Sequence, residues 1–179
     1  MQERIIISGY GGQGILSAGL LIAETSALLG YEVTYFPSYG AEMRGGSANC
    51  SIIFSDKKIS SAVIPQADTL ILFNQASFEK YIGKVQKNGL VIVNSSAITV
   101  PDEILTSGPA FVRVPVDNLA MESFGKTKVA NMIMIGAYFK IKAYDKLDAL
   151  KKSITEKFKT KGDALININF QAVDLGFAY

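Results

Sequence analysis

Glycines at positions 9, 11 and 14 lie between an apolar run and a helix-like segment. This G-x-G-x-x-G spacing is typical of loops that hold phosphates, because the first glycine permits a tight turn and the second lets the backbone approach the ligand. The third glycine is expected to pack the following helix against the strand. The N-terminus of that helix would offer N–H groups and a partial positive charge to an anion.

Three interpretations of this loop are open: a structural turn without a ligand, a dinucleotide site, or a site for another phosphate-bearing ligand or a protein contact. A dinucleotide site needs an acidic residue about 20 residues beyond the loop, where it binds the ribose. Residues 34–37 contain none, and Glu32 lies at the wrong end of the second predicted strand. The sequence therefore disfavours a nicotinamide-dependent dehydrogenase.

A second glycine-framed loop is expected at residues 38–47. Arg44 is the only arginine in it and lies between Met43 and two glycines. Such a setting favours close backbone contact with a partner while the guanidinium forms a bidentate contact. Tyr39, Met43 and Arg44 are also residue types that interfaces favour. The alternative is a solvated loop in which Glu42 and Arg44 pair loosely, contributing less than about 1 kcal/mol.

Asn131 interrupts the otherwise apolar stretch 129–139 of a helix expected over residues 128–142. We favour a buried amide with satisfied hydrogen bonds over a polar contact to a ligand. No catalytic or metal-binding residue is assigned. The candidate cofactor-binding or subunit-interface residues are Gly9, Gly11, Gly12, Gln13, Gly14, Ser38, Tyr39, Gly40, Glu42, Arg44, Gly45, Gly46 and Asn131.

Composition excludes several kinds of chemistry. The chain has no histidine and one cysteine, Cys50, which we expect to be a small core residue. Catalysis by Ser-His-Asp or Cys-His groups and histidine-ligated metal sites are therefore excluded, and one cysteine cannot hold an iron–sulfur cluster by itself. A net charge of +2 without a lysine–arginine block argues against nucleic acid as a partner. A hydrophobic fraction of 49% with 19% charged residues predicts apolar surface that meets other subunits.

Strands that alternate with helices predict an α/β fold, a Rossmann-like, doubly wound, mostly parallel sheet with a helical C-terminal part, in a single domain over residues 1–179. Pro37 is expected to end the second strand, Asn88-Gly89 to form a turn, and residues 58–63 to pair with the third strand as a hairpin. Strands are expected at residues 4–8, 32–36, 48–54, 69–73, 90–94 and 111–114, and helices at 14–29, 75–82, 118–124, 128–142, 146–159 and 163–175.

The stretch 129–139 of the expected helix is apolar on every side, which predicts either a central core helix or one buried against a partner. No stretch reaches the roughly 18 apolar residues that span a bilayer. The N-terminus also lacks the regions of a signal peptide. We therefore expect a cytoplasmic protein that does not enter the membrane.

Three stretches together resemble the γ subunit of 2-oxoacid:ferredoxin oxidoreductases, and the resemblance extends over the whole chain. They are residues 9–14 (GYGGQG), residues 37–50 (PSYGAEMRGGSANC), and residues 129–132 (VANM) followed by Gly136-Ala137. The resemblance implies a Rossmann-like subunit of a cytoplasmic enzyme that oxidatively decarboxylates a 2-oxoacid with coenzyme A and reduces ferredoxin. Residues 38–46 look closest to subunits of 2-oxoglutarate enzymes, while pyruvate, branched-chain 2-oxoacids and indolepyruvate stay open as substrates.

The resemblance also implies which cofactors and partners to expect. In that family, thiamine diphosphate lies between the α and β subunits, and the iron–sulfur clusters lie on other chains or domains. This chain is then expected to bind no cofactor alone and to have no activity of its own. Thiamine diphosphate, Mg²⁺ and the clusters are expected on partner subunits, with coenzyme A nearby. The implied partners are α, β and, where one exists, δ subunits, with ferredoxin reached through the complex.

Both glycine loops, residues 9–14 and 38–46, are expected at the carboxyl edge of the sheet, where they would approach coenzyme A or the thiamine-bearing subunits. When isolated, the chain is expected to be able to pair with a second copy of itself through its uncovered interface. The alternative from another class is a stand-alone nucleotide-binding or redox-sensing module, which would bind NAD, FAD or an adenine nucleotide by itself.

Overall fold

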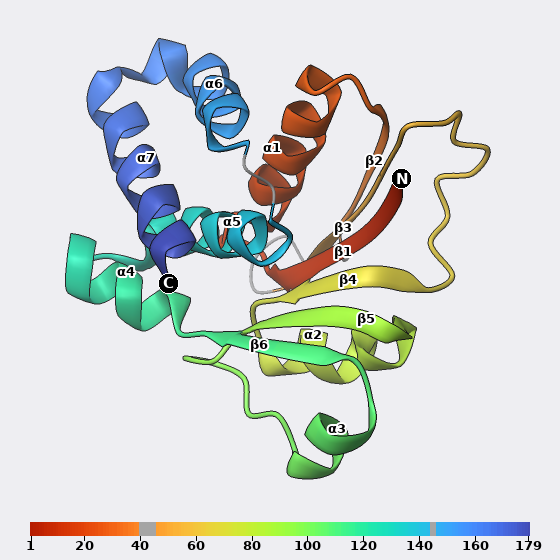
Figure 1. The fold of residues 1–179 in the computed structure, drawn as a ribbon. Coiled ribbons are helices and arrows are strands. Elements are labelled where there is room, and N and C mark those ends of the chain that lie inside the picture. Colours follow the sequence, from red (N-terminus) through yellow and green to blue (C-terminus); the bar gives the residue numbers. More distant parts are fainter. Residues whose placement is uncertain (40–45, 144–145) are drawn as a thin grey trace.

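The computed structural model describes residues 1–39, 46–143 and 146–179, and a central sheet with helices on both faces forms the molecule (Figure 1). The strands are β1 (Gln2–Tyr10), β2 (Glu32–Tyr39), β3 (Ser47–Ser55), β4 (Ala67–Leu72), β5 (Val85–Asn94) and β6 (Ala110–Val114). The helices are α1 (Ile15–Leu28), α2 (Gln75–Tyr81), α3 (Asp102–Ser107), α4 (Val116–Phe124), α5 (Ala130–Ile141), α6 (Leu147–Phe158) and α7 (Asp163–Ala178), with 3-10 turns η1 (Ile82–Lys84), η2 (Thr127–Val129) and η3 (Lys159–Lys161). In these described segments, no helix has the length and apolar character needed to cross a membrane.

The sheet has the strand order β2-β3-β1-β4-β5-β6 in the described part of the chain. β1, β4, β5 and β6 are mutually parallel, whereas β3 runs antiparallel to both of its neighbours, β1 and β2. β2 therefore has the same direction as β1. The expected mostly parallel α/β sheet is confirmed, with β3 as its exception.

The isoleucine run in β1 shows why this sheet is covered on both faces. Ile5 and Ile7 pack into a core under α1 and α5, whereas Ile6 packs into a second core under α2. Successive side chains of a strand point to opposite faces, so a continuous apolar run needs helices on both sides. Figure 1 shows α1, α5, α6 and α7 above the sheet and α2 and α3 below it.

The apolar sequence of α5 was expected to form either a central core helix or a helix buried against a partner. The structure shows a central core helix. Every residue from Ala130 to Phe139 is buried. α7 crosses α5 at Gly136 and Gly176, where an added Cβ would overlap the backbone of the opposite helix. These two glycines let the helix backbones touch, so α7 rather than another chain covers this side of α5.

Two strand predictions are wrong for reasons of position in the sheet. β2 continues through Pro37 to Tyr39, because β2 is an edge strand and an edge strand tolerates the missing N–H of proline. Residues 58–63 form no strand. Their expected partner, β3, already has β1 on one side and β2 on the other, so it has no free edge for a hairpin.

Two further differences lie between β4 and β6. Asn88-Gly89 does not form the expected turn but lies inside β5, where the pairing with β4 shifts register. An added Cβ at Gly89 would lie 2.6 Å from Val85 Cγ2, so the absence of a side chain at this position permits the register shift. α3, at Asp102–Ser107, was not expected from the sequence.

Candidate ligand-binding and subunit-interface site

The first glycine loop and the two described ends of the second meet at the carboxyl edge of β1. β1 ends at Tyr10, which lies opposite Ser47, the first residue of β3. The end of β2 lies beside the same point of β3. The Gly11 N–H donates a hydrogen bond to the Gly46 carbonyl at 3.0 Å. The first loop and the described ends of the second, Tyr39 and Gly46, therefore lie together at this edge, and a direct backbone contact joins Gly11 to Gly46.

The first loop is closed by its own hydrogen bonds. The Tyr10 N–H donates to Gln13 Oε1 at 2.6 Å, and the Gln13 N–H donates back to the Tyr10 carbonyl at 3.2 Å. At Gly9, an added Cβ would lie 2.6 Å from Gln13 Oε1 and 2.9 Å from Phe73 Cβ, so only glycine fits. The N–H groups of Tyr10 and Gly11 are thus used within the protein, and an anion would have to meet the loop further along, towards α1.

The third glycine has a different role from the one expected. Gly14 has a left-handed backbone (φ 75°), and an added Cβ there would overlap the Asn131 side chain at the start of α5. Close packing of α1 on the sheet occurs instead at Gly19, where a Cβ would overlap Cys50 Sγ on β3. Gly14 therefore makes room for a polar side chain rather than for a strand.

Asn131 lies behind the loop, and only one end of its amide has a hydrogen-bond partner among the described residues. The residue is 5% exposed, and its Nδ2 donates to the Gly14 carbonyl at 3.2 Å. A carbonyl oxygen can only accept, so this bond fixes the orientation of the amide. Its Oδ1 is buried without a hydrogen-bond partner among the described residues. The favoured interpretation of a satisfied buried amide is thus right for one end of the side chain and wrong for the other.

A third loop, after β4, belongs to the same edge and was missed by the sequence analysis. α1 follows β1 on one face of the sheet and α2 follows β4 on the other (Figure 1), so ligands are expected between β1 and β4. There the Phe73 N–H donates to the Ser8 carbonyl at 2.9 Å. Asn74 Oδ1 accepts from the Ser77 N–H at 2.8 Å, while its buried Nδ2 finds no partner in the described segments. An asparagine between an apolar strand and a helix was the available signal.

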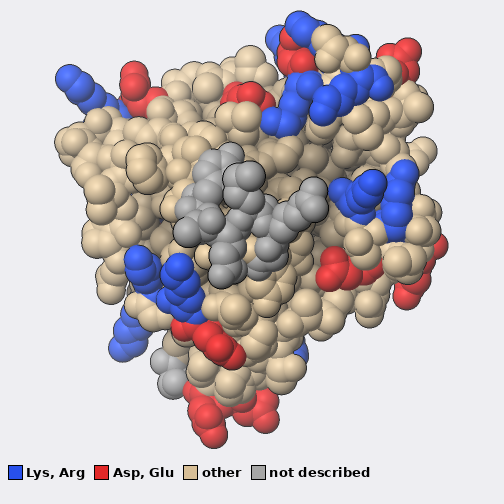
Figure 2. Space-filling model, turned by 180° about the vertical axis from the view of Figure 1, so that it is seen from behind, with Lys and Arg blue, Asp and Glu red and all other residues tan. Residues whose placement is uncertain are grey.

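Of the remaining candidate residues, some lie in the described segments and others do not. Ser38 is half-buried near the end of β2, and Gly12 lies exposed in the first loop with a left-handed φ of 96°. Four candidates, Gly40, Glu42, Arg44 and Gly45, lie outside the described residues. On the face shown in Figure 2, the lysines, arginines and acidic residues of the described segments lie in separate groups toward the margins.

The strand order argues against a dinucleotide site. In dinucleotide-binding folds the strand that carries the ribose-binding acid lies next to β1, in the order 3-2-1-4-5-6. Here β3 lies between β1 and β2, so the end of β2 is displaced from β1 by two strand spacings, about 10 Å. This agrees with the missing acidic residue at residues 34–37.

The donor set does not fit an iron–sulfur cluster or a metal ion. Cys50 is fully buried on β3, and burial raises the pKa of its thiol to about 12, far from the thiolate that a cluster needs. Within residues 1–39, 46–143 and 146–179, no three His, Cys, Asp or Glu side chains are grouped so as to hold a metal. This chain's described residues therefore offer no place for these cofactors.

The family described as pyruvate ferredoxin/flavodoxin oxidoreductase matches residues 4–179. The chain belongs to this family. It is 30% identical over 177 residues to a ketoisovalerate oxidoreductase subunit of Methanothermobacter marburgensis, covering 98% of this chain but 36% of the relative. It is 37% identical over 136 residues to a 2-oxoglutarate synthase subunit of Archaeoglobus fulgidus, covering 76% and 68%. The chain thus spans about a third of the ketoisovalerate relative.

Two solved structures share the fold of this family member. The γ subunit of a keto/oxoacid ferredoxin oxidoreductase from Geobacter sulfurreducens PCA superposes with a TM-score of 0.84 at 26% identity, covering 99% of this chain and 95% of that one. A 2-oxoglutarate:ferredoxin oxidoreductase chain from Magnetococcus marinus, with 2-oxoglutarate, coenzyme A and succinyl-CoA bound, gives 0.87 at 28% identity, covering 99% and 30%. The same fold therefore occurs as a separate subunit and as part of a longer chain.

Proposed function

We propose that this chain is the non-catalytic γ subunit, a single domain over residues 1–179, of a cytoplasmic 2-oxoacid:ferredoxin oxidoreductase. The enzyme would oxidatively decarboxylate 2-oxoglutarate with coenzyme A, yielding the acyl-CoA and CO2 and reducing ferredoxin. The Gly11–Gly46 hydrogen bond carries the proposal, because it joins two motifs far apart in the sequence into one surface at the ligand-binding edge. Pyruvate, branched-chain 2-oxoacids and indolepyruvate are the alternative substrates.

This surface would approach coenzyme A or the thiamine-bearing subunits. α1 begins at Ile15 beside the loop and has no acidic residue in its first turn, which favours an anion such as a phosphate. Arg44 would add a fixed positive charge. Coenzyme A is named among the ligands of the Magnetococcus marinus enzyme, which supports its presence near this fold. Asn131 Oδ1 would accept from a hydroxyl or amide of the ligand or from a bridging water.

The partners would supply the chemistry that this chain lacks. α and β subunits would hold thiamine diphosphate and Mg²⁺, and the iron–sulfur clusters would lie on these or on a δ subunit. Electrons would pass through them to ferredoxin. The role of this chain would be to bind, orient and shield, because it has no histidine and its only cysteine is buried.

Purification of the tagged chain from its native host tests the proposal. We expect thiamine-binding chains to co-purify, and the assembly to reduce ferredoxin with coenzyme A faster with 2-oxoglutarate than with pyruvate, 3-methyl-2-oxobutanoate or indolepyruvate. A preference for another of these acids would change the substrate only. Recovery as a lone monomer, together with micromolar NAD binding in calorimetry, would instead favour a stand-alone nucleotide-binding module.

A further inference from the structure

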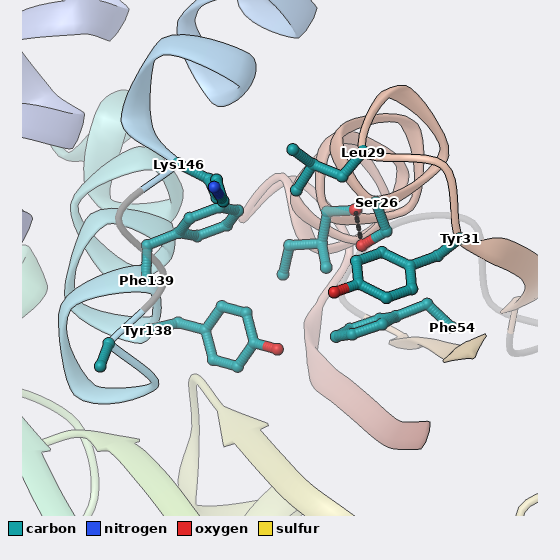
Figure 3. Close-up of a pocket in the computed structure, with 9 residues that line it drawn as sticks. Ser26, Leu29, Tyr31, Phe54, Tyr138, Phe139 and Lys146 are labelled. Carbon is teal, nitrogen blue, oxygen red and sulfur yellow. Dashed lines mark hydrogen bonds between the residues drawn. The ribbon is translucent and has the colours of Figure 1, made fainter. Parts of the chain in front are cut away.

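A cavity of about 460 Å³ lies at the other end of α1 and α5, away from the glycine loops (Figure 3). It is formed where the last turns of both helices meet the start of β2 and the end of β3. Three stretches that are distant in the sequence, 22–31, the end of β3 and 138–146, contribute its described lining. Among the described residues, its lining is formed by Ile22, Ser26, Leu29, Tyr31, Phe54, Tyr138, Phe139, Ala143 and Lys146.

The wall of the cavity is mainly aromatic. The Tyr31 and Phe54 rings are tilted, with centroids 5.5 Å apart, and the Tyr138 and Phe139 rings meet edge to face at 5.7 Å. Figure 3 shows the hydroxyls of Tyr31 and Tyr138 pointing toward one another across the space. Ser26 Oγ donates to the carbonyl of Ile22 at 2.8 Å within α1, so this hydroxyl is already satisfied. Such a wall suits a flat or branched apolar group.

Lys146 brings a positive charge to the cavity that no described side chain pairs with. Its side chain is exposed and lies over Phe139 in Figure 3, and it makes no ion pair within the described part of the chain. The other nearby lysine, Lys142, is used differently. Its Nζ lies 2.8 Å from the carboxylate of the buried Glu3, which is directly opposite Phe54 in the sheet. Glu3 is thus neutralised by Lys142, and Lys146 remains available.

We propose that this cavity binds a small monocarboxylate whose apolar body is an aromatic ring or a branched alkyl group. The body would lie against the aromatic wall, and the carboxylate would reach Lys146. The volume is roughly three times the 150 Å³ of a cavity that accommodates benzene, which leaves room for a ring with its side chain. This site goes beyond the proposed function and does not depend on it, because it lies at the opposite edge of the sheet.

Equilibrium dialysis of the full chain with radiolabelled phenylacetate and 4-methylpentanoate tests the proposal, with neutral phenylacetamide as the uncharged probe. We expect one saturable site per chain for both carboxylates, with a Kd below about 1 mM, and weaker binding of phenylacetamide. Lys146→Gln should raise the Kd of both carboxylates about five- to tenfold, consistent with loss of a charge-assisted contact, and leave phenylacetamide unchanged. Lys146→Arg should retain most of the affinity.

Two variants separate a specific site from general attraction. Lys152→Gln, at an exposed lysine of α6, is the matched control and should leave every Kd unchanged. Leu29→Trp, at the partly exposed edge of the cavity, should weaken carboxylates and phenylacetamide alike, with thermal unfolding by circular dichroism showing that the chain is folded.

Several results would overturn the proposal. They are non-saturable uptake, equal effects of Lys146→Gln and Lys152→Gln, or equal affinity for phenylacetate and phenylacetamide. Saturable binding by the isolated chain that disappears in the assembled complex would also overturn it, since a partner side chain would then occupy the cavity.

Discussion

α1 and α5 connect two regions of different chemistry, the glycine-loop edge and the aromatic cavity. At the first, α1 begins beside Gly14 and α5 begins beside Asn131, and the surface is made of backbone groups, glycines and an amide. At the second, the same helices end among large rings and a lysine. The first region has amide atoms without a hydrogen-bond partner among the described residues, whereas the second has open space and an apolar wall. One pair of helices therefore borders polar groups at one end and an apolar cavity at the other.

The largest expected effect is on stability at the glycine-loop edge. Gly14→Ala should lower the free energy of unfolding by about 3 kcal/mol, because left-handed strain of about 1–2 kcal/mol adds to the overlap with Asn131. Gly12→Ala is the matched control, since Gly12 also has a positive φ but open space around it, and it should cost only the strain, about 1–2 kcal/mol. Urea unfolding measures both. Equal losses would show that the Asn131 contact does not restrict this position.

Arg44→Ala should act on the assembly and not on the fold. We expect the KM for coenzyme A or the Kd for subunit association to rise about tenfold, because a hydrogen bond to a charged group contributes about 1.5–3 kcal/mol. The free energy of unfolding of the isolated chain should change by less than about 0.5 kcal/mol. Arg113→Ala, at an exposed arginine of β6, is the control. Wild-type coenzyme A kinetics and assembly in Arg44→Ala would make this loop ordinary surface.

Asn131→Leu separates stability from function at the buried amide. The variant loses the bond to Gly14 but also removes an unpaired buried acceptor, so the free energy of unfolding should change by less than about 1 kcal/mol. The assembled enzyme should show a higher KM for coenzyme A. Asn169→Leu, at a buried amide of α7 away from this edge, should leave that KM unchanged. A strongly destabilised Asn131→Leu with normal kinetics would assign the amide to the fold alone.

The smallest expected effect on stability concerns Cys50. Its thiol lies on β3 where α1 packs closely, so its reactivity reports on that packing. Burial raises the pKa of its thiol from about 9 to about 12, so the folded state disfavours the thiolate. This contribution to stability is complete below pH 9 and is lost as the pH rises toward 12. We expect slow labelling by iodoacetamide at pH 8 that becomes fast in urea, and a urea midpoint that falls above pH 9. Fast labelling of the folded chain at pH 8 would show that α1 separates readily from β3.

Local patterns predicted most of the helices and strands, and pairing between distant segments accounts for the errors. The apolar run at residues 4–8 and the periodic helix at residues 146–159 were placed well, because each pattern depends on neighbours in the chain. Pro37 and residues 58–63 were misjudged because their states depend on where β2 and β3 lie in the sheet. α3 is too short for a periodic signal.

The sequence by itself determined the family, the mostly parallel α/β fold and the edge at which the first glycine loop lies. Each of these follows from motifs and periodicities within short stretches of chain. The tertiary structure alone decided that Gly14 contacts Asn131, which is 117 residues away, and that three distant stretches of chain line a cavity. The physical reason is that sheet register and helix packing set these contacts. The insertion of β3 between β1 and β2 is a matter of strand order, which no local pattern encodes.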